Sequence, residues 1–419
     1  MKKLIALIIF SISVNLYSQG WKVIQGAEMP LPVYGGEAVV VDSLIYVLGG
    51  FSDSLNINVK VIQEFNPREN SWRIIDSMNA SRYGFVAGNF QDSVLIIGGI
   101  SLNLSLDSSL EIWNLNSPPY VFDLRPDFIR TFATGLIHDT TLYVFGGVSV
   151  NLLSTYMFEY SIPDSTFPFR NNFGFLAAYP FQQMSAYAAN SIYLFGGVFI
   201  ATSRAIYRYD LQNKSLDLLQ TELLQSRAGG RAVSLGDSLI YVIGGFNETA
   251  LAHSSMEIFS VVNGNYTITN GPPLNFERSE LMAVEYGNSI YVFGGKDDSG
   301  EPVKQTEKLD FVTSIENENI PGPDDFILYP NYPNPFNPST NISFYIPSRS
   351  LVQIKIYNLA GEEIFELVNE EKEEGTHRVL FSDKNFPALS SGVYFYRIIA
   401  FNFSTQNTYI DTRKMLLLK

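Results

Sequence analysis

One short phrase occurs six times in the first 295 residues of this sequence, and it limits the fold more than any other feature. A polar turn is followed by a run of β-branched and aromatic residues and then by two glycines, as in Asp42–Gly50. The later copies end at Gly98-Gly99, Gly146-Gly147, Gly196-Gly197, Gly244-Gly245 and Gly294-Gly295, so successive copies lie 48 to 50 residues apart. A fixed period near 50 residues with four predicted strands in each period is typical of a closed ring of β-sheets.

Each repeat is predicted to contain four short strands. The first begins around a small-residue segment that arginine often leads, as in Arg82-Tyr83-Gly84, and the second ends in the glycine pair. A loop of about ten residues leads to a third strand with an aromatic residue near its end, and a turn leads to a fourth strand, clearest at Asn70–Ile75. Short apolar runs separated by turn residues indicate an all-β chain.

The glycine pairs are interpreted as scaffold. Where neighbouring sheets converge on an axis, a Cβ would block close approach of the backbone, and glycine adopts positive φ without steric cost. No predicted helix follows the pairs, so they do not form phosphate-binding loops. The structural glycines are Gly49, Gly50, Gly98, Gly99, Gly146, Gly147, Gly196, Gly197, Gly244, Gly245, Gly294 and Gly295.

Taken together, these features resemble the kelch repeat, whose diagnostic positions are the glycine pair, a following aromatic residue and a tryptophan. The resemblance covers about residues 20–311 and implies a β-propeller. Trp21–Ile24 aligns with the fourth-strand segment Trp72–Ile75, whereas the last repeat ends after its third strand at Lys308–Phe311. We therefore predict six blades, the last of them completed by the N-terminal strand, which removes exposed sheet edges.

Composition excludes several classes of protein. The chain has 419 residues, of which 46% are hydrophobic, so it can bury a large core. Its net charge is −14 and no run of lysine or arginine exceeds two residues, which argues against a nucleic-acid partner. The absence of cysteine excludes disulfides, thiolate metal sites and thiol nucleophiles.

The two ends of the first domain are marked by composition. Residues 1–18 are predicted to be a secretory signal peptide, with two lysines, an apolar stretch from Leu4 to Val14 and small or polar residues to Ser18. That stretch is too short to span a bilayer, and no transmembrane segment is expected in the mature chain. The propeller is placed at residues 20–313, and an acidic, proline-bearing linker follows at 314–325.

Residues 326–419 are predicted to form a second domain, a small immunoglobulin-like β-sandwich of short alternating strands. The segments Tyr332–Thr340, Val352–Asn358, Ser391–Tyr396 and Arg413–Lys419 resemble the type A C-terminal sorting domain of the type IX (Por) secretion system of Bacteroidota. The resemblance implies that the type IX machinery is a partner of this domain. It also implies passage across the outer membrane, removal of the tail near the linker, and release or attachment at the cell surface.

The loops after the glycine pairs are expected to carry binding, because they vary most in length and sequence around a rigid scaffold. Arg82, Arg130, Arg227 and Arg278 are predicted to point toward this face, where guanidinium groups could hold a carboxylate or sulfate. The alternative is that each arginine caps backbone carbonyls of a neighbouring blade or pairs with an acid. Further ligand-binding candidates are Asp53, His253 and Asp297, with solvated loop charge as the alternative for the acids.

No catalytic set, metal site or cofactor is predicted. The loop acids lack the spacing of a calcium loop, and the three histidines are scattered along the chain. The triplets Asp42-Ser43-Leu44, Asp92-Ser93-Val94 and Asp237-Ser238-Leu239 resemble O-glycosylation acceptors of Bacteroidota, but hairpin-turn chemistry is the favoured explanation.

These observations predict a secreted or outer-membrane surface protein, exported first to the periplasm by its signal peptide. Its propeller is expected to bind an unidentified protein or glycan rather than to act as an enzyme. The alternative is a sugar mutarotase or epimerase resembling bacterial kelch-type N-acetylneuraminate epimerase, since an arginine-lined mouth would suit an acidic sugar. The sequence assigns no acid–base pair to that reaction.

Overall fold

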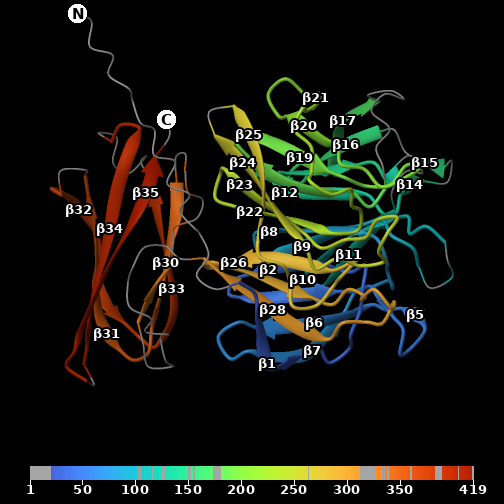
Figure 1. The fold of residues 1–419 in the computed structure, drawn as a ribbon. Helices are drawn as coiled ribbons and strands as arrows, with labels where there is room; N and C mark the ends of the chain where they lie inside the picture. The colour runs from blue at the N-terminus through green and yellow to red at the C-terminus, as the bar shows by residue number, and fades with distance from the viewer. Residues whose placement is uncertain are drawn as a thin grey trace, which may run out of the picture. The chain divides into compact units, whose positions relative to one another are not determined.

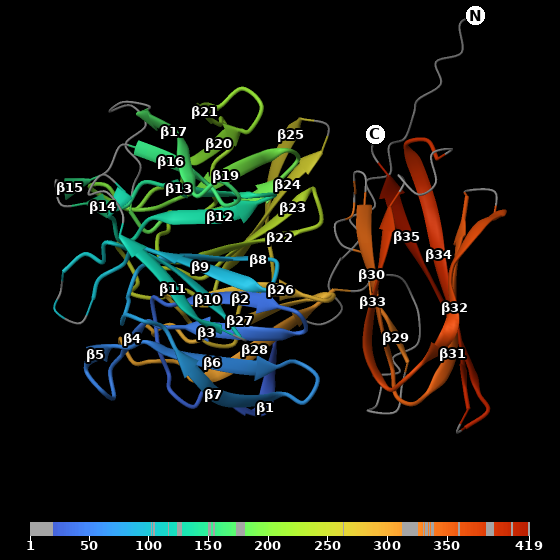
Figure 2. The same ribbon diagram turned by 180° about the vertical axis from the view of Figure 1, so that it is seen from behind.

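The computed structural model describes residues 20–311 and 326–417, apart from residues 102, 104, 116, 124–127, 150–151, 154–155, 173–180, 263, 330, 332–333, 335, 337–338, 359–360, 383–388 and 404. The chain divides into two compact units, Met1–Thr313 and Ser314–Lys419. The described residues form strands and no α-helix, so the all-β prediction is confirmed (Figure 1, and from behind in Figure 2). The predicted signal peptide at 1–18 and linker at 314–325 lie outside the described residues.

The described part of the first unit contains six four-stranded antiparallel sheets, which we number as blades in chain order. Blade one contains β2 (Glu37–Val41), β3 (Leu44–Leu48), β6 (Val61–Asn66) and β7 (Ser71–Ser77). Blade two contains β8 (Val86–Phe90), β9 (Ser93–Ile97), β10 (Ser109–Asn114) and β11 (Ser117–Asp123). Blade three contains β12 (Thr134–His138), β13 (Thr141–Phe145), β16 (Tyr156–Ser161) and β17 (Thr166–Asn172). Blade four contains β18 (Met184–Ala188), β19 (Ser191–Phe195), β20 (Ile206–Asp210) and β21 (Ser215–Leu218). Blade five contains β22 (Arg231–Leu235), β23 (Leu239–Ile243), β24 (Met256–Val262) and β25 (Asn265–Asn270).

The sixth blade joins the two ends of this unit. It contains β26 (Met282–Tyr286), β27 (Ser289–Phe293), β28 (Gln305–Asp310) and the N-terminal strand β1 (Lys22–Glu28). β1 pairs antiparallel with β28, with Lys22 opposite Lys308. The first strands β2, β8, β12, β18, β22 and β26 each contact the next, and β26 contacts β2. The ring is therefore closed, and the predicted role of the N-terminal strand is confirmed.

The arginine-led segment is not the first strand of its blade, contrary to the prediction. Tyr83 forms an isolated bridge to Ile100, immediately after the second glycine, and β8 begins only at Val86. Equivalent bridges join Tyr34 to Phe51 and Ala228 to Phe246. They bring the approach to each blade and the loop after its glycine pair to one end of the axis.

This end is termed the loop face. Its loops are the described residues within 51–57, 100–107, 148–154, 198–203, 246–253 and 296–303. Two of them contain two-residue ribbons, β4 (Phe51–Ser52) with β5 (Ile57–Asn58) and β14 (Val148–Ser149) with β15 (Leu152–Leu153), on the right-hand side of the propeller in Figure 1.

The glycine pairs lie where adjacent blades meet. Gly98 has a φ of 72°, and a Cβ there would lie 2.2 Å from the carbonyl oxygen of Arg130 in the next blade. The N–H of Gly99 donates a hydrogen bond to that same oxygen over 2.9 Å. A side chain at Gly98 would therefore push apart two backbones that are hydrogen-bonded to each other.

Large aromatic side chains fill the space between blades. Trp113 of blade two packs 5.4 Å from the ring of Tyr46 in blade one, and both are buried. Trp72 of blade one packs 5.2 Å from Phe293 of blade six. Burying such side chains stabilises a fold by about 1.5–3 kcal/mol each. The core is therefore a ring of interblade clusters.

The second unit is a sandwich of two antiparallel sheets. One contains β29 (Ile327–Leu328), β30 (Ser339–Ile346) and β33 (Gly375–Ser382), and the other contains β32 (Glu363–Lys372), β31 (Ser350–Tyr357), β34 (Gly392–Asn402) and β35 (Thr408–Leu417). Burial alternates strictly along β30, as expected for a strand with one face in a core. Phe344 and Phe381 of the first sheet share that core with Ile354, Tyr396 and Met415 of the second. The immunoglobulin-like topology stays a prediction.

Candidate functional site

The four arginines predicted to bind a ligand are buried inside the propeller. Arg82, Arg227 and Arg278 are 0% exposed and Arg130 is 3% exposed. Each Nη1 donates a hydrogen bond of 2.7–3.0 Å to the carbonyl oxygen of the first glycine in its own blade. A ligand on the loop face does not reach these guanidinium groups. The predicted exposure at this face is therefore wrong, and the carbonyl capping expected from a neighbouring blade occurs within the same blade.

A buried glutamate completes this arrangement in three blades. In blade five, Arg227 Nη2 lies 2.6 Å from Glu257 Oε1, and the same carboxylate accepts the N–H of Leu224 over 2.6 Å. Glu111 and Glu307 pair with Arg82 and Arg278 in the same way. Burial raises the pKa of Glu111 and lowers the pKa of Arg227, because each charged form loses hydration. These pairs hold the chain as it crosses between blades.

Blades one and three carry other residues at the glutamate position. In blade one, Val33 stands at the arginine position and Gln63 at the glutamate position. Gln63 Oε1 accepts the N–H of Leu31 over 2.9 Å and its Nε2 donates to the carbonyl of Leu31 over 2.8 Å. In blade three, the guanidinium of Arg130 lies 4.9 Å from the ring centre of Phe158, which replaces the glutamate. The arginine and glutamate positions therefore have a structural role that different pairs of side chains can fulfil.

A closed ring of backbone hydrogen bonds surrounds the axis at the loop face. In each blade the residue two positions after the arginine position has a φ between 54° and 66°. Its N–H donates to the carbonyl of the equivalent residue in the preceding blade over 2.6–2.9 Å, and the bond from Gly35 to Glu280 closes the circle. The residues of this axial ring are Gly35, Gly84, Phe132, Gln182, Gly229 and Glu280.

Three positions of the axial ring carry side chains in a conformation that favours glycine. Phe132, Gln182 and Glu280 have φ values of 54°, 55° and 54°. The left-handed region costs such residues roughly 1–2 kcal/mol each. Strain of this kind persists where the surroundings fix it, and it clusters at functional sites. In the sequence, this site is marked by residues other than glycine at the repeat position two residues after the arginine. The prediction of a ligand site considered the arginines and did not consider this position.

The carboxylate of Glu280 is the polar centre of the axial ring. Tyr83 Oη, from blade two, donates a short hydrogen bond to Glu280 Oε2. Gln182 Nε2, from blade four, donates to Oε1 over 3.4 Å, and Lys296 Nζ, from blade six, lies 3.1 Å from Oε1. Since these groups come from three blades, they hold the carboxylate close to the axis.

Aromatic rings cover the neighbouring part of the axial ring. Tyr34 packs edge-on against Tyr83 at 6.0 Å, Tyr83 packs edge-on against Phe132 at 5.2 Å, and Phe51 lies 5.4 Å from Tyr34. A Cβ on Gly35 would lie 2.2 Å from the Tyr83 ring, so this ring lies directly over the glycine. The four aromatic side chains are partly exposed. Together with Glu280 they form the mouth, an aromatic floor around a carboxylate.

A small cavity lies inside the axial ring. Its volume is about 50 Å³, and Glu37, Arg231 and Glu280 supply its charged groups. Arg231 Nη2 lies 2.8 Å from Glu37 Oε1 and donates to the carbonyl of Gly36 over 2.8 Å. A water molecule takes up about 30 Å³ in the liquid, so the cavity has room for one or two waters. A larger ligand does not fit inside the axial ring.

The remaining predicted ligand-binding residues do not converge on one site. Asp53 lies at the edge of the mouth, where its Oδ1 accepts the hydroxyl of Tyr34 over 3.2 Å. Asp297 is used by its own loop: the hydroxyl and N–H of Ser299 donate to it, and these bonds help to lower the pKa of Asp297. Burial lowers the pKa of His253, which leaves the imidazole neutral at pH 7. In the described part of the chain, no group of three His, Asp or Glu residues could hold a metal ion.

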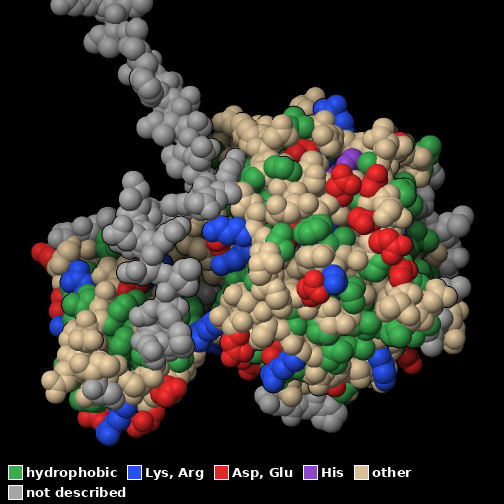
Figure 3. Space-filling model, turned by 60° about the horizontal axis from the view of Figure 1, so that its bottom comes forward, with side chains coloured by type: hydrophobic (Ala, Val, Ile, Leu, Met, Phe, Trp, Pro, Cys, Tyr) green, Lys and Arg blue, Asp and Glu red, His purple; other side chains and the backbone are tan. Residues whose placement is uncertain are grey.

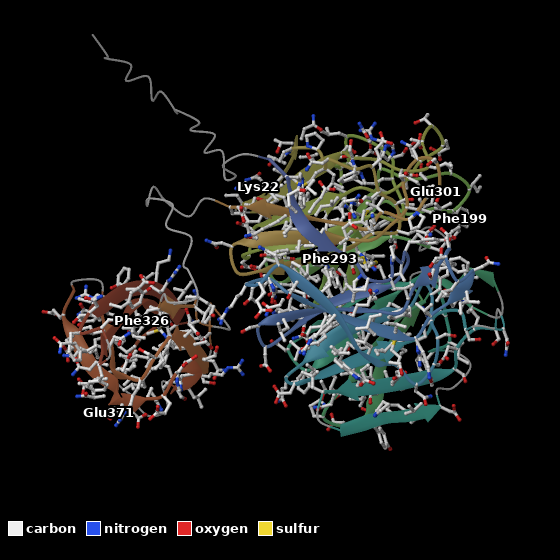
Figure 4. All side chains as sticks on the ribbon, turned by 90° about the horizontal axis from the view of Figure 1, so that it is seen from below. Lys22, Phe199, Phe293, Glu301, Phe326 and Glu371 are labelled. Atoms are coloured by element: carbon white, nitrogen blue, oxygen red, sulfur yellow. The ribbon has the colours of Figure 1, made fainter. Side chains whose placement is uncertain are left out.

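Exposed apolar side chains occur in three loops of the loop face, and we term them the rim. They are Leu55, Ile57, Phe199, Ile200 and Leu251, in the loops of blades one, four and five, and Ile200 is 90% exposed. Figure 4 places Phe199 and Glu301 on the same side of the propeller.

The six loops contain six acids (Asp53, Asp107, Glu248, Asp297, Asp298 and Glu301) but a single lysine, and acidic side chains gather toward the right of the propeller in Figure 3. Exposed apolar groups beside polar ones are typical of interaction surfaces.

Glu285, on β26, gives the propeller a predicted pH dependence. Burial raises its pKa from about 4.5 to about 7, so the folded protein holds a proton there that the unfolded chain releases. The resulting stabilisation is complete below pH 4.5, declines as the pH rises to 7, and amounts to about 2–3 kcal/mol. Glu285→Gln should therefore leave the free energy of unfolding nearly unchanged at pH 4.5 and raise it at pH 8.

Urea unfolding followed by tryptophan fluorescence measures this effect, since all three tryptophans (Trp21, Trp72 and Trp113) lie in the propeller. Glu277→Gln, which changes an exposed carboxyl group of the same blade, is the control and should have the same effect at both pH values. An equal change for Glu285→Gln at pH 4.5 and pH 8 would contradict the assignment.

Comparison with known proteins finds family matches in both parts of the chain. A family model of the kelch motif matches residues 32–79, and one of the secretion system C-terminal sorting domain matches residues 331–410. Kelch-like protein 38 of Mus musculus is 26% identical over 133 residues, which are 30% of this chain and 22% of that protein. Kelch-like protein 34 of Homo sapiens is 21% identical over 114 residues, 25% of this chain and 17% of that protein. The matches thus cover about a fifth of each relative.

Both resemblances seen in the sequence are thereby confirmed: the chain contains a match to the kelch motif and a match to the secretion system C-terminal sorting domain. The sorting domain indicates export by type IX secretion, to the cell surface or the medium. Within the described residues, no helix is long and apolar enough to cross a membrane.

Proposed function

We propose that this protein works outside the cell as a binding module, and that its loop face binds another protein. The observation that carries this proposal is the exposed apolar rim on the same face as the aromatic mouth. Protein interfaces combine aromatic anchors at their centre with a surrounding zone that excludes water. The rim and the mouth supply these two parts on one face.

The loops of this face are held by contacts between neighbouring blades. Asp298 of blade six accepts the N–H of Leu251 in blade five over 2.7 Å. Asn58 of blade one donates to the carbonyl of Ile100 in blade two over 3.0 Å. A surface fixed before binding loses less conformational entropy when a partner docks. These contacts favour a preorganised binding face.

The alternative of a sugar epimerase loses the feature that favoured it. That alternative depended on an arginine-lined mouth for an acidic sugar, and all four arginines are buried within the blades. The mouth presents Tyr83 instead, and burial together with Glu280 raises the pKa of its hydroxyl, so that it remains a hydrogen-bond donor. Fixed donors and aromatic faces suit recognition.

Substitutions in the rim test the proposal. Full-length protein is cross-linked at the surface of its host, and binding of the captured partner is then measured with purified proteins. The double variant Ile200→Asp and Leu251→Asp should weaken binding at least about tenfold, since it places charges in an apolar contact. Leu218→Asp is the matched control, because Leu218 is 58% exposed on β21, outside the loop face.

Equal losses in the rim variant and in Leu218→Asp would contradict a loop-face interface, and so would unchanged binding in both. A glycan array probed with the same variants tests the other partner class. Rim-dependent binding to a glycan without any bound protein would replace the protein partner by a carbohydrate.

A further inference from the structure

We propose that the mouth binds a basic side chain of the partner, an arginine or a lysine, in a cage made by Tyr34, Tyr83 and Glu280. The inference rests on the proposed binding function and specifies the chemistry of the ligand at the centre of that face. Three independent observations carry it: an ammonium group already held in the cage, the state of the two phenols, and the charge of the loops.

The cage already holds a cation from the protein itself. Lys296 Nζ lies 4.8 Å from the ring centre of Tyr34 and 3.1 Å from Glu280 Oε1. An ammonium over an aromatic face and beside a carboxylate is stabilised by both. Lys296 is also an exception among its repeat equivalents, the residues that follow the glycine pairs: Phe51, Ile100, Val148, Val198 and Phe246 are all apolar. The mouth is therefore chemically matched to a cationic group.

Both tyrosine hydroxyls are directed to carboxylates. Tyr34 Oη donates to Asp53 over 3.2 Å, and Tyr83 Oη donates to Glu280. Burial and these acids raise the pKa of both phenols, so the rings remain neutral at any physiological pH. Donation to an anion leaves the ring more electron-rich, and the negative face of such a ring attracts cations. The hydroxyl contacts fix the ring orientations before a ligand arrives.

The charge of the loop face favours a basic ligand over an acidic one. The six loops carry six acids against a single lysine, and that lysine is neutralised by Glu280. The four arginines do not offset these acids at the surface, since all are buried and hydrogen-bonded within their blades. A negative potential of this kind accelerates the approach of basic partners and repels acidic ones.

A partner cation would take the place of Lys296. The Lys296 side chain is 28% exposed, so its ammonium can move into solvent and regain hydration, while Glu280 is 9% exposed and stays in the mouth. A guanidinium suits the vacated cage because it is planar, stacks on aromatic rings and forms two hydrogen bonds to one carboxylate. Lys296 thus competes with the ligand.

Because Lys296 competes with the ligand, the direction in which each substitution changes the affinity can be predicted. Peptides Ac-Ser-Gly-Xaa-Gly-Ser-amide, with arginine, citrulline or glutamate at Xaa, are titrated into the full-length protein, and dissociation constants are measured by ligand-detected NMR. The arginine peptide should bind about tenfold more tightly to Lys296→Met and at least about tenfold more weakly to Glu280→Gln, each change corresponding to about 1.4 kcal/mol. The citrulline and glutamate peptides should bind at least tenfold more weakly than the arginine peptide.

Lys304→Met is the matched control, because it removes one lysine charge from an exposed side chain whose ammonium pairs with Glu28. It should change the affinity less than twofold. Weaker or unchanged binding of the arginine peptide by Lys296→Met would overturn the inference. Tighter binding of the glutamate peptide than of the arginine peptide would also overturn it, because Lys296 would then hold the ligand's carboxylate.

The inference and the proposed function fail in different ways. Partner binding that responds to Ile200→Asp and Leu251→Asp but not to Lys296→Met or Glu280→Gln would overturn the basic-ligand inference alone. Partner binding that responds to none of these variants would overturn the proposed function as well. Tryptophan fluorescence and urea unfolding confirm that each variant keeps the folded propeller.

Discussion

Deletion of residues 330–419 is expected to abolish delivery of the protein to the cell surface and the medium, and to leave it in the periplasm. The sorting domain matched at residues 331–410 is removed, while the propeller keeps its whole core. The described core of the second unit lies between Leu328 and Leu417, and every interblade cluster lies between Trp21 and Phe311. The loss of export should therefore occur without loss of folding.

The measurement is immunodetection in the medium, on intact cells and in periplasmic extracts of a host with a type IX system. Two controls separate sorting from misfolding. The truncated protein should keep the tryptophan emission of the full-length protein, and residues 326–419 fused to a periplasmic reporter should direct that reporter out of the cell. Unchanged surface display of the truncated protein would refute the role of the tail.

Replacing Arg278 by valine is expected to cost the propeller about 3–5 kcal/mol of its free energy of unfolding. Arg278 donates to the carbonyls of Gly294 and Gln305 over 2.7 and 2.8 Å, and its Nη2 lies 3.0 Å from Glu307 Oε1. Both charged side chains are 0% exposed. Valine leaves Glu307 as a buried carboxylate without its counter-charge. Urea unfolding followed by tryptophan fluorescence measures the loss.

Blade one supplies the rescue for this variant. There Val33 and Gln63 occupy the positions of Arg278 and Glu307, and Gln63 holds the N–H of Leu31 without a charge. The double variant Arg278→Val and Glu307→Gln should therefore recover about half of the loss. It should also bind the partner as the natural protein does. Weaker partner binding by a stably folded double variant would restore a ligand role for the arginine.

The propeller is readable from the sequence because each blade is built from local signals. A turn, a short apolar strand and a glycine pair are contiguous in the chain, as in Asp42–Gly50, and their repetition predicts the number of blades. The unpaired strand at Trp21 predicts the closure, since an incomplete sheet must find its fourth strand elsewhere in the chain. The sorting domain is readable for a different reason: several of its short segments occur in the order of a known family.

The arginines show a feature that could not be predicted from the sequence, namely the direction of a side chain. The sequence places Arg227 next to the loop face, but it does not specify whether the side chain points outward or back into its blade. That direction depends on Glu257 and on the carbonyl of Gly244, which lie 30 and 17 residues away in the chain. Two buried partners outweigh exposure to solvent, because a guanidinium with both hydrogen bonds and a counter-charge tolerates burial.

The sequence by itself determined the all-β class, the repeat, the closure by the N-terminal strand and the sorting tail. Only the tertiary structure decided which residues form the mouth. Glu280, Tyr83 and Gln182 belong to different blades and lie 98 to 197 residues apart, and they meet because the closed ring brings the same repeat position of every blade to one axis. Local signals encode each blade, whereas the contacts between distant blades exist only once the ring has closed.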